Sequence, residues 1–260
     1  MFLKQPTICL LIVPIILVST LIPQVSGNHA EPLHCAAAFT AGLVNATYLI
    51  EDLSAFDEEQ KKLDAFLSIG GFSSERLTEG HSGEGVMLLE RKLYAHFAKL
   101  PCVKSICEIG FNGGHSALNW LVANPLANVT MFDIFQHPYS SRAEQHLLQQ
   151  AHLKPQRFQI LKGNSVSVVR ALHTSQPQFK CDIISIDGAH DFKTATKDLM
   201  NMWHLARKPF NILLIDDTNC DSVWCVDEVI DEGLRRGIIR VHEGFSLGEN
   251  KRGISIMSFL

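Results

Sequence analysis

The stretch from Ile106 to Leu121 reads ICEIGFNGGHSALNWL and decides how the rest of the chain is interpreted. Its apolar start, as far as Ile109, predicts a short strand. The glycines that follow permit a tight turn and a close backbone approach to a ligand. Ser116 to Asn124 then predicts a helix that ends before Pro125. A helix start of this kind points free N–H groups at a ligand, although glycine turns without a ligand are also common.

The first 27 residues predict a targeting segment. A long apolar run from Ile8 to Val18 follows Lys4, and the small residues at Val25–Gly27 fit a cleavage site. We therefore expect a secretory signal peptide over residues 1–27. The alternative is an uncleaved anchor, because the apolar run approaches a membrane-spanning length of about 20 residues. In both cases the rest of the chain would lie in the secretory-pathway lumen or outside the cell, and it would meet a membrane only through this segment.

Composition fits one globular domain with an N-terminal extension. Of 260 residues, 46% are hydrophobic, which allows a full core. The net charge of -4 argues against a nucleic-acid partner. Sequons at Asn45 and Asn128 predict a secreted glycoprotein.

The cysteines predict disulfide bonds. With the cysteine of the signal segment removed, an even set remains, but the connectivity cannot be deduced from the sequence. Cys220 and Cys225 flank a short loop and could pair locally. Cys102 and Cys181 both precede expected strands, and they could pair if those strands are neighbours. Cys107, inside a strand, could instead be a small core residue.

The mature chain divides into two parts. Residues 28–80 predict a helical extension, with helices over Cys35–Phe56 and Asp57–Ile69 and a break at Gly70–Ser74. Residues 81–260 predict the main domain. It begins with an amphipathic helix from Val86 to Leu100, whose apolar side chains fall on one face.

After this helix, apolar strands alternate with helices, which predicts a parallel sheet covered on both faces. The expected strands are Ile106–Ile109, Val129–Phe132, Phe158–Leu161, Asp182–Ile186 and Ile212–Ile215. The expected helices include Ala143–Leu153, Ser165–His173, Phe192–Leu205 and one marked by Val223 to Leu234. The last two strands, Ile238–Val241 and Ile254–Phe259, are joined by the polar loop Ser246–Arg252. They predict a hairpin that adds an antiparallel strand to the sheet.

Polar or acidic residues follow every expected parallel strand. Doubly wound sheets bind ligands outside the carboxyl ends of their strands. One such residue would be an ordinary loop residue, but five groups together predict a binding site. They are the glycine turn, Asp133, Gly163–Ser165, Asp187–His190 and Asp216–Asn219.

Asp133 follows Gly110 by 23 residues. An acid about 20 residues beyond the turn can accept hydrogen bonds from the ribose hydroxyls of a nucleoside; the alternative is an ordinary surface aspartate. Asn112 and His115 break the spacing G-x-G-x-x-G, which disfavours a dinucleotide-dependent oxidoreductase.

These residues resemble a known family. The turn E-I-G-F-N-G-G-H-S, the later Asp133, the D-G-A-H after the fourth strand and the final hairpin look like class I S-adenosylmethionine-dependent methyltransferases. The nearest resemblance is to small-molecule O-methyltransferases of the catechol and caffeoyl-CoA type and their D-G-x-H relatives, and it covers roughly Gly80 to the C-terminus. It implies an α/β fold with a doubly wound, mostly parallel seven-stranded sheet of order 3-2-1-4-5-7-6, whose last strand is antiparallel. It also implies a small-molecule acceptor.

The resemblance assigns S-adenosylmethionine contacts by position. Glu108 and the glycine turn would hold the methionine and ribose portions, and Asp133 would bind the ribose hydroxyls. Acidic residues in a partly buried site attract the positive sulfonium and ammonium groups of this cofactor. The full expected set is Glu108, Gly110, Asn112, Gly113, Gly114, Ser116, Asp133, Asn164, Ser165 and Asp187, with Asn164 and Ser165 beside the adenine and Asp187 near the sulfonium.

Members of this family that bind a divalent metal carry an Asp after the fourth strand and an Asp-Asn pair after the fifth. Asp187 fits the first position, but this chain reads Asp216-Asp217-Thr218-Asn219 at the second. We expect Asp187, Asp217 and Asn219, or Thr218 in its place, to hold Mg²⁺ or another divalent cation, which oxygen ligands suit. The alternative is that the aspartates cap the strand without an ion.

The expected catalytic residues are His190, Asp187 and Lys193. His190 stands where catechol-type members carry a lysine base, and a histidine can remove a hydroxyl proton near neutral pH. The alternative is a loop histidine bonded to a carboxylate, with Lys193 as the base. The acceptor oxygen would attack the methyl carbon in line, and the protein would contribute mainly positioning.

Two other functions stay open. One is a non-catalytic secreted binding protein on the same fold, because S-adenosylmethionine is made in the cytosol. The other is a metal-dependent hydroxylase-like enzyme, which shares the D-G-x-H pattern. The polar strand ends favour the methyltransferase. We expect Gly80–Glu84, the loop after Asn219 and Ser246–Lys251 to roof the acceptor pocket, and the chain could form a homodimer.

Overall fold

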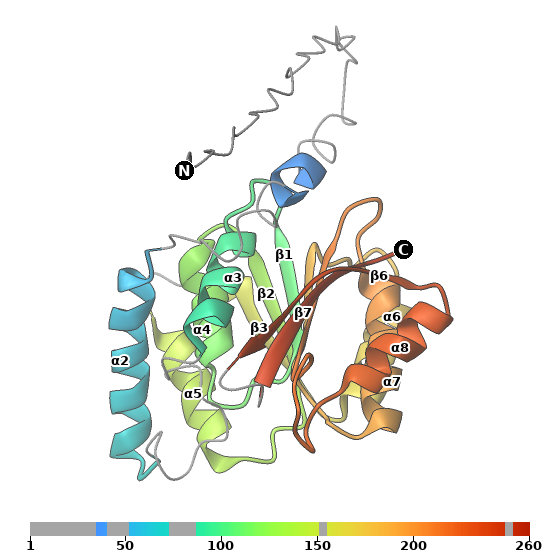
Figure 1. Ribbon diagram of the computed structural model, residues 1–260. Coiled ribbons are helices and arrows are strands. Elements are labelled where there is room, and N and C mark those ends of the chain that lie inside the picture. The colour runs from blue at the N-terminus through green and yellow to red at the C-terminus, as the bar shows by residue number, and fades with distance from the viewer. Residues whose placement is uncertain (1–34, 41–51, 73–86, 151–154, 248–251) are drawn as a thin grey trace, which may run out of the picture.

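The chain folds around one central sheet with helices on both sides (Figure 1). The structure is a computed structural model that describes residues 35–40, 52–72, 87–150, 155–247 and 252–260. Among these residues, none of the helices combines the length and the apolar character that crossing a membrane requires.

The sheet has seven strands in the order β3-β2-β1-β4-β5-β7-β6. The first five strands pair in parallel, and β7 pairs antiparallel with both β5 and β6. The predicted fold class, strand order and terminal hairpin are therefore confirmed. The strands are β1 Ser105–Ile109, β2 Asn128–Asp133, β3 Phe158–Lys162, β4 Ile183–Ile186, β5 Ile212–Asp216, β6 Ile239–Leu247 and β7 Arg252–Phe259.

The helices fall into two layers, with α2 to α5 on one side of the sheet and α6 to α8 on the other (Figure 1). Helix α2 packs against α4 and α5, so the N-terminal helical segment shares the core of the main domain. The helices are α2 Ser54–Ile69, α3 Leu88–Ala98, α4 His115–Ala123, α5 Pro138–Gln149, α6 Ser165–Ser175, α7 Phe192–Leu205 and α8 Asp227–Arg235, with a short 3-10 helix at Pro155–Arg157.

Each face of the sheet buries its own hydrophobic cluster, because successive side chains of a strand point to opposite faces. In β5, Ile212 and Leu214 pack with helices α2 to α5, whereas Leu213 and Ile215 pack with α6 to α8. This explains why the sequence of the central strands is continuously apolar rather than alternating. The sheet is a rigid base, and its carboxyl edge carries the polar residues.

Several element boundaries differ from those expected, among them the start of α8 at Asp227 rather than near Val223. Helix α2 begins at Ser54, so the expected break between Phe56 and Asp57 is wrong; residues 35–40 are helical and 41–51 lie outside the described residues. Helix α5 begins at Pro138, because proline suits a first helical position, where its missing N–H is not needed. Strand β6 continues to Leu247 through a β-bulge, so the hairpin loop is shorter than expected.

Three disulfides join the cysteines of the described residues: Cys35–Cys102, Cys107–Cys181 and Cys220–Cys225. The local pairing of Cys220 with Cys225 is confirmed. The pairing of Cys102 with Cys181, which the sequence left open, does not occur, and Cys107 is a disulfide partner rather than a small free core residue. Cys107 lies on the same face of the sheet as Cys181, and their Cα atoms are 5.8 Å apart because β1 and β4 are neighbours.

Candidate functional site

The glycine turn between β1 and α4 requires two of its glycines. Gly110 and Gly114 have φ angles of 104° and 83°, in the region that side chains disfavour. A Cβ atom on Gly110 would lie 1.7 Å from the backbone oxygen of Asp187, so this position also needs glycine for space. The turn therefore brings the end of β1 against the end of β4. Gly114 caps the N-terminus of α4, whose first backbone N–H groups point toward the carboxyl edge of the sheet.

Asp133, the last residue of β2, holds this turn in place. Its Oδ2 accepts hydrogen bonds from the backbone N–H groups of Phe111 and Asn112 at 2.7 and 3.0 Å. Its Oδ1 accepts one from Phe135 N at 2.5 Å. A carboxylate has about four acceptor positions, so these three bonds leave capacity for one more donor, such as a hydroxyl. Its predicted ribose contact and this fixing of the turn are compatible.

Glu108 in β1 lies in a buried hydrogen-bond network. Trp120 Nε1 donates to its Oε2 at 2.9 Å, and Ser185 Oγ donates to its Oε1 at 3.2 Å. The Tyr94 ring stacks on Trp120, with ring centroids 4.3 Å apart. Burial, with a further contribution from Asp187, raises the pKa of Glu108 to about 8. Tyr94, Trp120 and Ser185 were not predicted from the sequence. The one available signal was Ser185, a polar residue inside an apolar strand.

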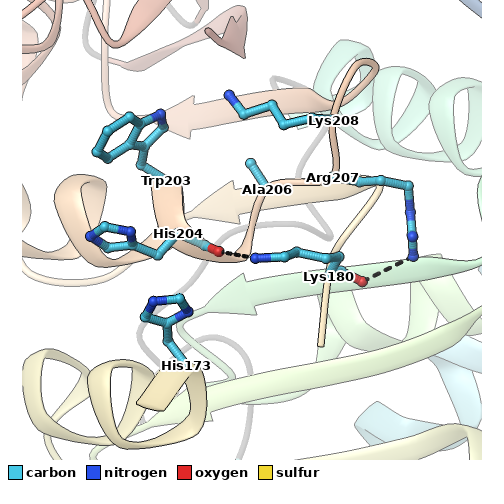
Figure 2. A pocket seen from close by; sticks show the side chains of 7 residues that line it. All are labelled: His173, Lys180, Trp203, His204, Ala206, Arg207 and Lys208. Atoms are coloured by element: carbon cyan, nitrogen blue, oxygen red, sulfur yellow. Dashed lines mark hydrogen bonds between the residues drawn. The ribbon is translucent and has the colours of Figure 1, made fainter. Parts of the chain in front are cut away.

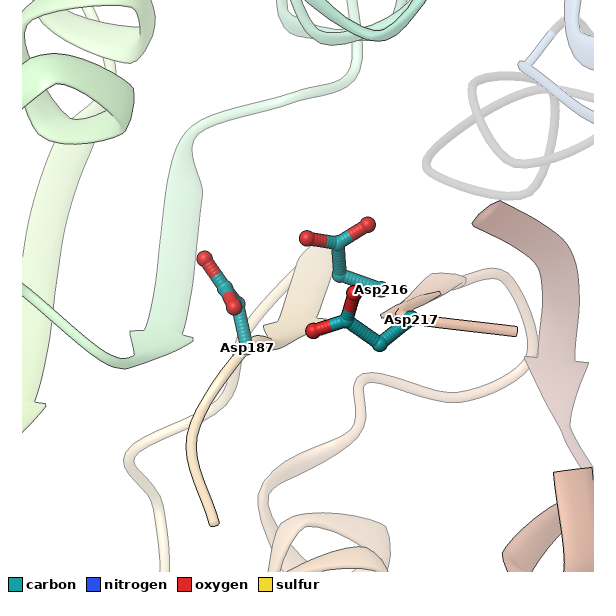
Figure 3. A group of neighbouring side chains, drawn as sticks. All are labelled: Asp187, Asp216 and Asp217. Atoms are coloured by element: carbon teal, nitrogen blue, oxygen red, sulfur yellow. The ribbon is translucent and has the colours of Figure 1, made fainter. Parts of the chain in front are cut away.

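Three aspartates meet at the ends of β4 and β5 (Figure 3). Asp187, Asp216 and Asp217 each offer a carboxylate oxygen, and these oxygens lie within 4.8 Å of one another. The parallel pairing of Ile186 with Ile215 brings the two strand ends level. Asp217 has a φ angle of 52°, so that two consecutive residues both direct their carboxyl groups into the same space. We call these three residues the aspartate cluster.

The aspartate cluster has an excess of buried acid. Burial, followed by repulsion from Asp217, raises the pKa of Asp187 to about 6. Burial also raises the pKa of Asp216 and of Glu90, a buried residue of α3, well above their ordinary values. Glu90 Oε2 and Asp216 Oδ1 are buried and have no hydrogen-bond partner among the described residues. A cation would offset this repulsion, and the nearest described arginine contact is Arg252, 3.8 Å from Asp217.

The donor set of the aspartate cluster fits a hard divalent cation. All of its ligand atoms are carboxylate oxygens, which Mg²⁺, Mn²⁺ and Ca²⁺ prefer. The unpartnered Oδ1 of Asp216 supplies a buried acceptor that a cation would satisfy. A cavity of about 10 Å³ has room for one water at most, and its lining includes all three aspartates of the cluster and His190.

His190 is bonded directly to the aspartate cluster. Its Nε2 lies 2.7 Å from Asp217 Oδ2, and this hydrogen bond raises the pKa of the imidazole against the opposing effect of burial. The ring of Trp224 lies edge-on to His190, with centroids 5.4 Å apart. The arrangement matches the expected loop histidine bonded to a carboxylate, and it also places an imidazole beside the cluster. The alternative of a loop histidine bonded to a carboxylate is therefore observed, and the role of His190 as a base stays a prediction.

Two predicted site residues lie away from the aspartate cluster. Asn219 Nδ2 donates to Ser255 Oγ at 2.7 Å, so its side chain lies against β7. Asp216 instead lies with Asp187 and Asp217, and the identity of the metal ligands stays a prediction. Lys193 is exposed on the first turn of α7, and none of its contacts in the described residues reaches the cluster.

The two residues expected beside the adenine lie at the end of β3. Asn164 is exposed and caps α6 with its backbone carbonyl, while the Ser165 hydroxyl donates to Asp198 of α7 at 3.0 Å. Asp198 is buried, and its burial raises its pKa to about 6. Ser165 therefore ties α6 to α7, and only its backbone and Asn164 face the open edge. The expected roof at residues 80–84 and most of 246–251 lies outside the described residues.

Comparison with known proteins shows which family this part of the chain is similar to. Residues 107–218 match a family model described as a methyltransferase domain, and this span contains the glycine turn, Asp133 and the aspartate cluster. Over these residues the chain is similar to this family, and we call this span the methyltransferase domain. The match begins inside β1 and ends two residues beyond β5. No curated protein sequence matched the chain.

Solved methyltransferases share the fold of the methyltransferase domain and its flanking helices. The O-methyltransferase from Bacillus cereus in complex with SAH superposes with a TM-score of 0.61 at 12% identity, over 87% of this chain and 100% of that one. The O-methyltransferase TomG from Streptomyces achromogenes, in complex with SAM, gives 0.59 at 14% identity, over 85% and 96%. An SAH-bound methyltransferase from Podospora anserina gives 0.56 at 15%, over 92% and 100%. The predicted resemblance to class I methyltransferases is confirmed.

Proposed function

We propose that the methyltransferase domain transfers the methyl group of S-adenosylmethionine to a hydroxyl of a small molecule, in the secretory pathway or outside the cell. The observation that carries this proposal is the aspartate cluster, which lies beside a glycine turn held by Asp133. The neighbours from B. cereus and S. achromogenes were solved with SAH and SAM, which supports the same cofactor here.

The cofactor would lie along the carboxyl edge from Asp133 to Asp187. Backbone N–H groups at the start of α4 would face its carboxylate, and the remaining acceptor position of Asp133 would take a ribose hydroxyl. Glu108 and Asp187 would face the ammonium and sulfonium groups, because a nearby positive charge favours the ionised form of an acid whose pKa burial has raised. When bound, S-adenosylmethionine supplies an electrophilic methyl carbon.

His190 would accept the proton of the acceptor hydroxyl. Because Asp217 accepts the hydrogen of Nε2, the neutral imidazole carries its lone pair on Nδ1, which is then the basic nitrogen. A divalent cation on the aspartate cluster would lower the pKa of a hydroxyl bound beside it. The two contributions are compatible, since both act on the same proton.

The loop closed by the Cys220–Cys225 disulfide supports a flat, apolar acceptor. Val223 and Trp224 on this loop are 89% and 61% exposed, which is unusual for such large apolar side chains. Trp224 contacts His190, so this apolar surface adjoins the proposed base. An aromatic hydroxyl compound could stack there while its oxygen faces Nδ1.

The secretory location is supported by the disulfides. Disulfides persist in oxidising compartments and are rare in the cytosol, and two of the three found here cross-link segments more than 60 residues apart. The sequon residue Asn128 is exposed at the start of β2, at the edge opposite the site, where a glycan would leave the site open. Asn45 lies outside the described residues.

Calorimetry on the secreted, glycosylated protein tests the proposal. S-adenosylmethionine should bind, and labelled methyl groups should pass to catechol as a probe acceptor in the presence of Mg²⁺. Asp187→Asn should abolish transfer, whereas Asp231→Asn, which changes an exposed acid on α8, should leave it unchanged. No binding of S-adenosylmethionine, with or without Mg²⁺, would end the enzyme hypothesis. Binding without transfer to any phenol or sugar hydroxyl would instead favour a secreted binding protein.

A further inference from the structure

A second cavity, of about 420 Å³, lies far from the aspartate cluster. Its walls come from the ends of α6 and α7 and from the segments that lead into β4 and β5, so it lies at the amino edge of the sheet, opposite the methyltransferase site. Its volume is typical of small-molecule pockets, which range from about 300 to 1,000 Å³. The lining residues are His173, Lys180, Trp203, His204, Ala206, Arg207 and Lys208 (Figure 2), and we call this cavity the basic pocket.

The charge of the basic pocket is positive and only partly balanced. Lys180 Nζ donates to the backbone oxygen of His204 at 2.6 Å, and Lys208 Nζ donates to the backbone oxygen of Leu260. The His204 carbonyl fixes the Lys180 ammonium group in position without neutralising it, and both ammonium groups keep further N–H donors. Arg207 is paired with the carboxylate of the buried Asp182. None of the lining residues is acidic.

The positively charged groups of the basic pocket repel one another electrostatically. Burial lowers the pKa of His204, and His173 and Lys180 lower it further. Burial also lowers the pKa of Lys208, with Lys180 as the second cause. The Nδ1 atom of His173 is buried and has no hydrogen-bond partner among the described residues. A bound anion would relieve this repulsion and offer acceptors to the remaining donors.

Aromatic rings form one side of the basic pocket. The rings of His173 and His204 stack, with centroids 4.7 Å apart and an angle of 14° between them, and Trp203 lies 5.1 Å from His204. Figure 2 shows these three rings along one side and the cationic chains extending from the other. Such an arrangement accommodates a flat group on the ring side and an anionic group on the lysine side.

We propose that the basic pocket binds a small molecule that carries a phosphate or sulfate group on an aromatic ring. The oxyanion would accept hydrogen bonds from Lys180 and Lys208, and the ring would lie against Trp203 and His204. This site is separate from the methyltransferase site, and the proposal does not depend on the proposed transfer reaction.

Calorimetry with phenyl phosphate and phenyl sulfate, on the full secreted protein saturated with S-adenosylhomocysteine, tests the proposal. We expect saturable binding of one or both, at least about tenfold tighter than inorganic phosphate, because phosphate lacks the ring. The double variant Lys180→Gln/Lys208→Gln should weaken binding about tenfold or more, since it removes two charge-assisted hydrogen bonds. Lys197→Gln, an exposed lysine of α7 outside the pocket, is the matched control and should leave the affinity unchanged.

A single variant, Lys208→Gln, guards against misfolding, because Lys208 is exposed and its removal leaves the Arg207–Asp182 pair intact. Trp203→Leu should remove the preference for phenyl phosphate over inorganic phosphate. The proposal is wrong if the folded wild-type protein binds neither aryl anion at millimolar concentration, or if both lysine variants keep full affinity. Retention on phosphatidylcholine vesicles containing phosphatidic acid, without binding of either aryl anion, would overturn it in favour of a membrane surface.

Discussion

His190 Nε2 lies 2.7 Å from Asp217 Oδ2, so one side-chain pair joins the loop after β4 to the end of β5. The hydrogen bond raises the pKa of His190 because it favours the protonated imidazole. A histidine with a raised pKa stabilises the fold below its unfolded pKa of about 6.5, and this contribution is lost as the pH rises through the folded pKa. The same pair therefore affects both stability and the availability of a base.

Asp217→Asn should lower the pKa of His190 in the protein treated with a chelator. The amide cannot attract the imidazolium as the carboxylate does, so burial, which opposes protonation, becomes the larger effect. NMR titration of the His190 ring measures this change directly. Asp221→Asn in the neighbouring loop is the control and should not move it. An unchanged His190 pKa in Asp217→Asn would show that the pair does not persist in solution.

His190→Gln should reduce methyl transfer by about 100-fold or more, the range expected for loss of a general base. S-adenosylmethionine affinity should change by less than about threefold, because no cofactor contact is assigned to this ring. Steady-state kinetics and calorimetry measure the two quantities separately. His242→Gln is a suitable control, since His242 bonds to Ser258 on the far hairpin. Equal turnover in His190→Gln and wild type would assign the base elsewhere.

Asp216→Asn should weaken Mn²⁺ binding by about tenfold or more while raising the melting temperature of the metal-free protein. The first effect follows from the loss of a carboxylate ligand. The second follows because burial raises the pKa of Asp216. At neutral pH the ionised carboxylate therefore lowers the stability of the folded protein, and an uncharged amide does not. Calorimetry with Mn²⁺ and thermal unfolding in a chelator measure the two effects. A lower melting temperature of the metal-free variant would contradict the interpretation that the buried Asp216 carboxylate destabilises the fold.

The position of Asp216 in the aspartate cluster could not be predicted from the sequence. The apolar strands and the polar residues after them were enough to predict the sheet and the edge that carries the candidate site, and the family resemblance supplied the strand order. They did not predict which of four consecutive polar residues face inward. That choice depends on positive φ angles at Asp217 and Asn219 and on the bond from Thr218 N to Gly253 O of β7, a residue 35 positions away.

The buried acid on α3 was missed for a related reason. Periodicity placed Leu89, Leu93 and Phe97 on the apolar face, and that pattern treats Glu90 as a solvent-facing position. In the fold, Glu90 is only 5% exposed, because α3 packs against α4 near the carboxyl edge of the sheet. Helical periodicity identifies the apolar face of a helix. It does not predict which polar residues beside that face are buried by a neighbouring helix. Only the tertiary packing brings Glu90 near Asp187.

Glu108→Gln should separate cofactor binding from stability. The pKa of Glu108 is about 8, so the acid is mostly protonated at pH 7 without cofactor, and glutamine keeps an acceptor for Trp120. The melting temperature at pH 7 should therefore stay close to the wild-type value. S-adenosylmethionine affinity should fall about tenfold, because the amide cannot ionise beside the ammonium group. Trp120→Phe is the contrasting variant, and by leaving a buried acceptor unpaired it should cost roughly 1–3 kcal/mol of stability.

The disulfides allow a test of what the chain gains from each cross-link. Cys107 and Cys181 are 74 residues apart, whereas Cys220 and Cys225 are 5 apart. Loop-closure entropy predicts that Cys107→Ala/Cys181→Ala lowers the free energy of unfolding by about 4 kcal/mol, against about 2 kcal/mol for Cys220→Ala/Cys225→Ala. Urea unfolding of both variants measures these values.

The Cys220–Cys225 disulfide should contribute more to acceptor binding than to the stability of the fold. It closes the loop that presents Trp224 to His190, so Cys220→Ala/Cys225→Ala should raise the KM for an aromatic acceptor while leaving S-adenosylmethionine affinity unchanged. The Cys107–Cys181 disulfide lies in the core and joins β1 to the segment that leads into β4, so its loss should lower stability before it changes KM. If the two variants showed the same split between stability and KM, the Cys220–Cys225 loop would have no special part in acceptor binding.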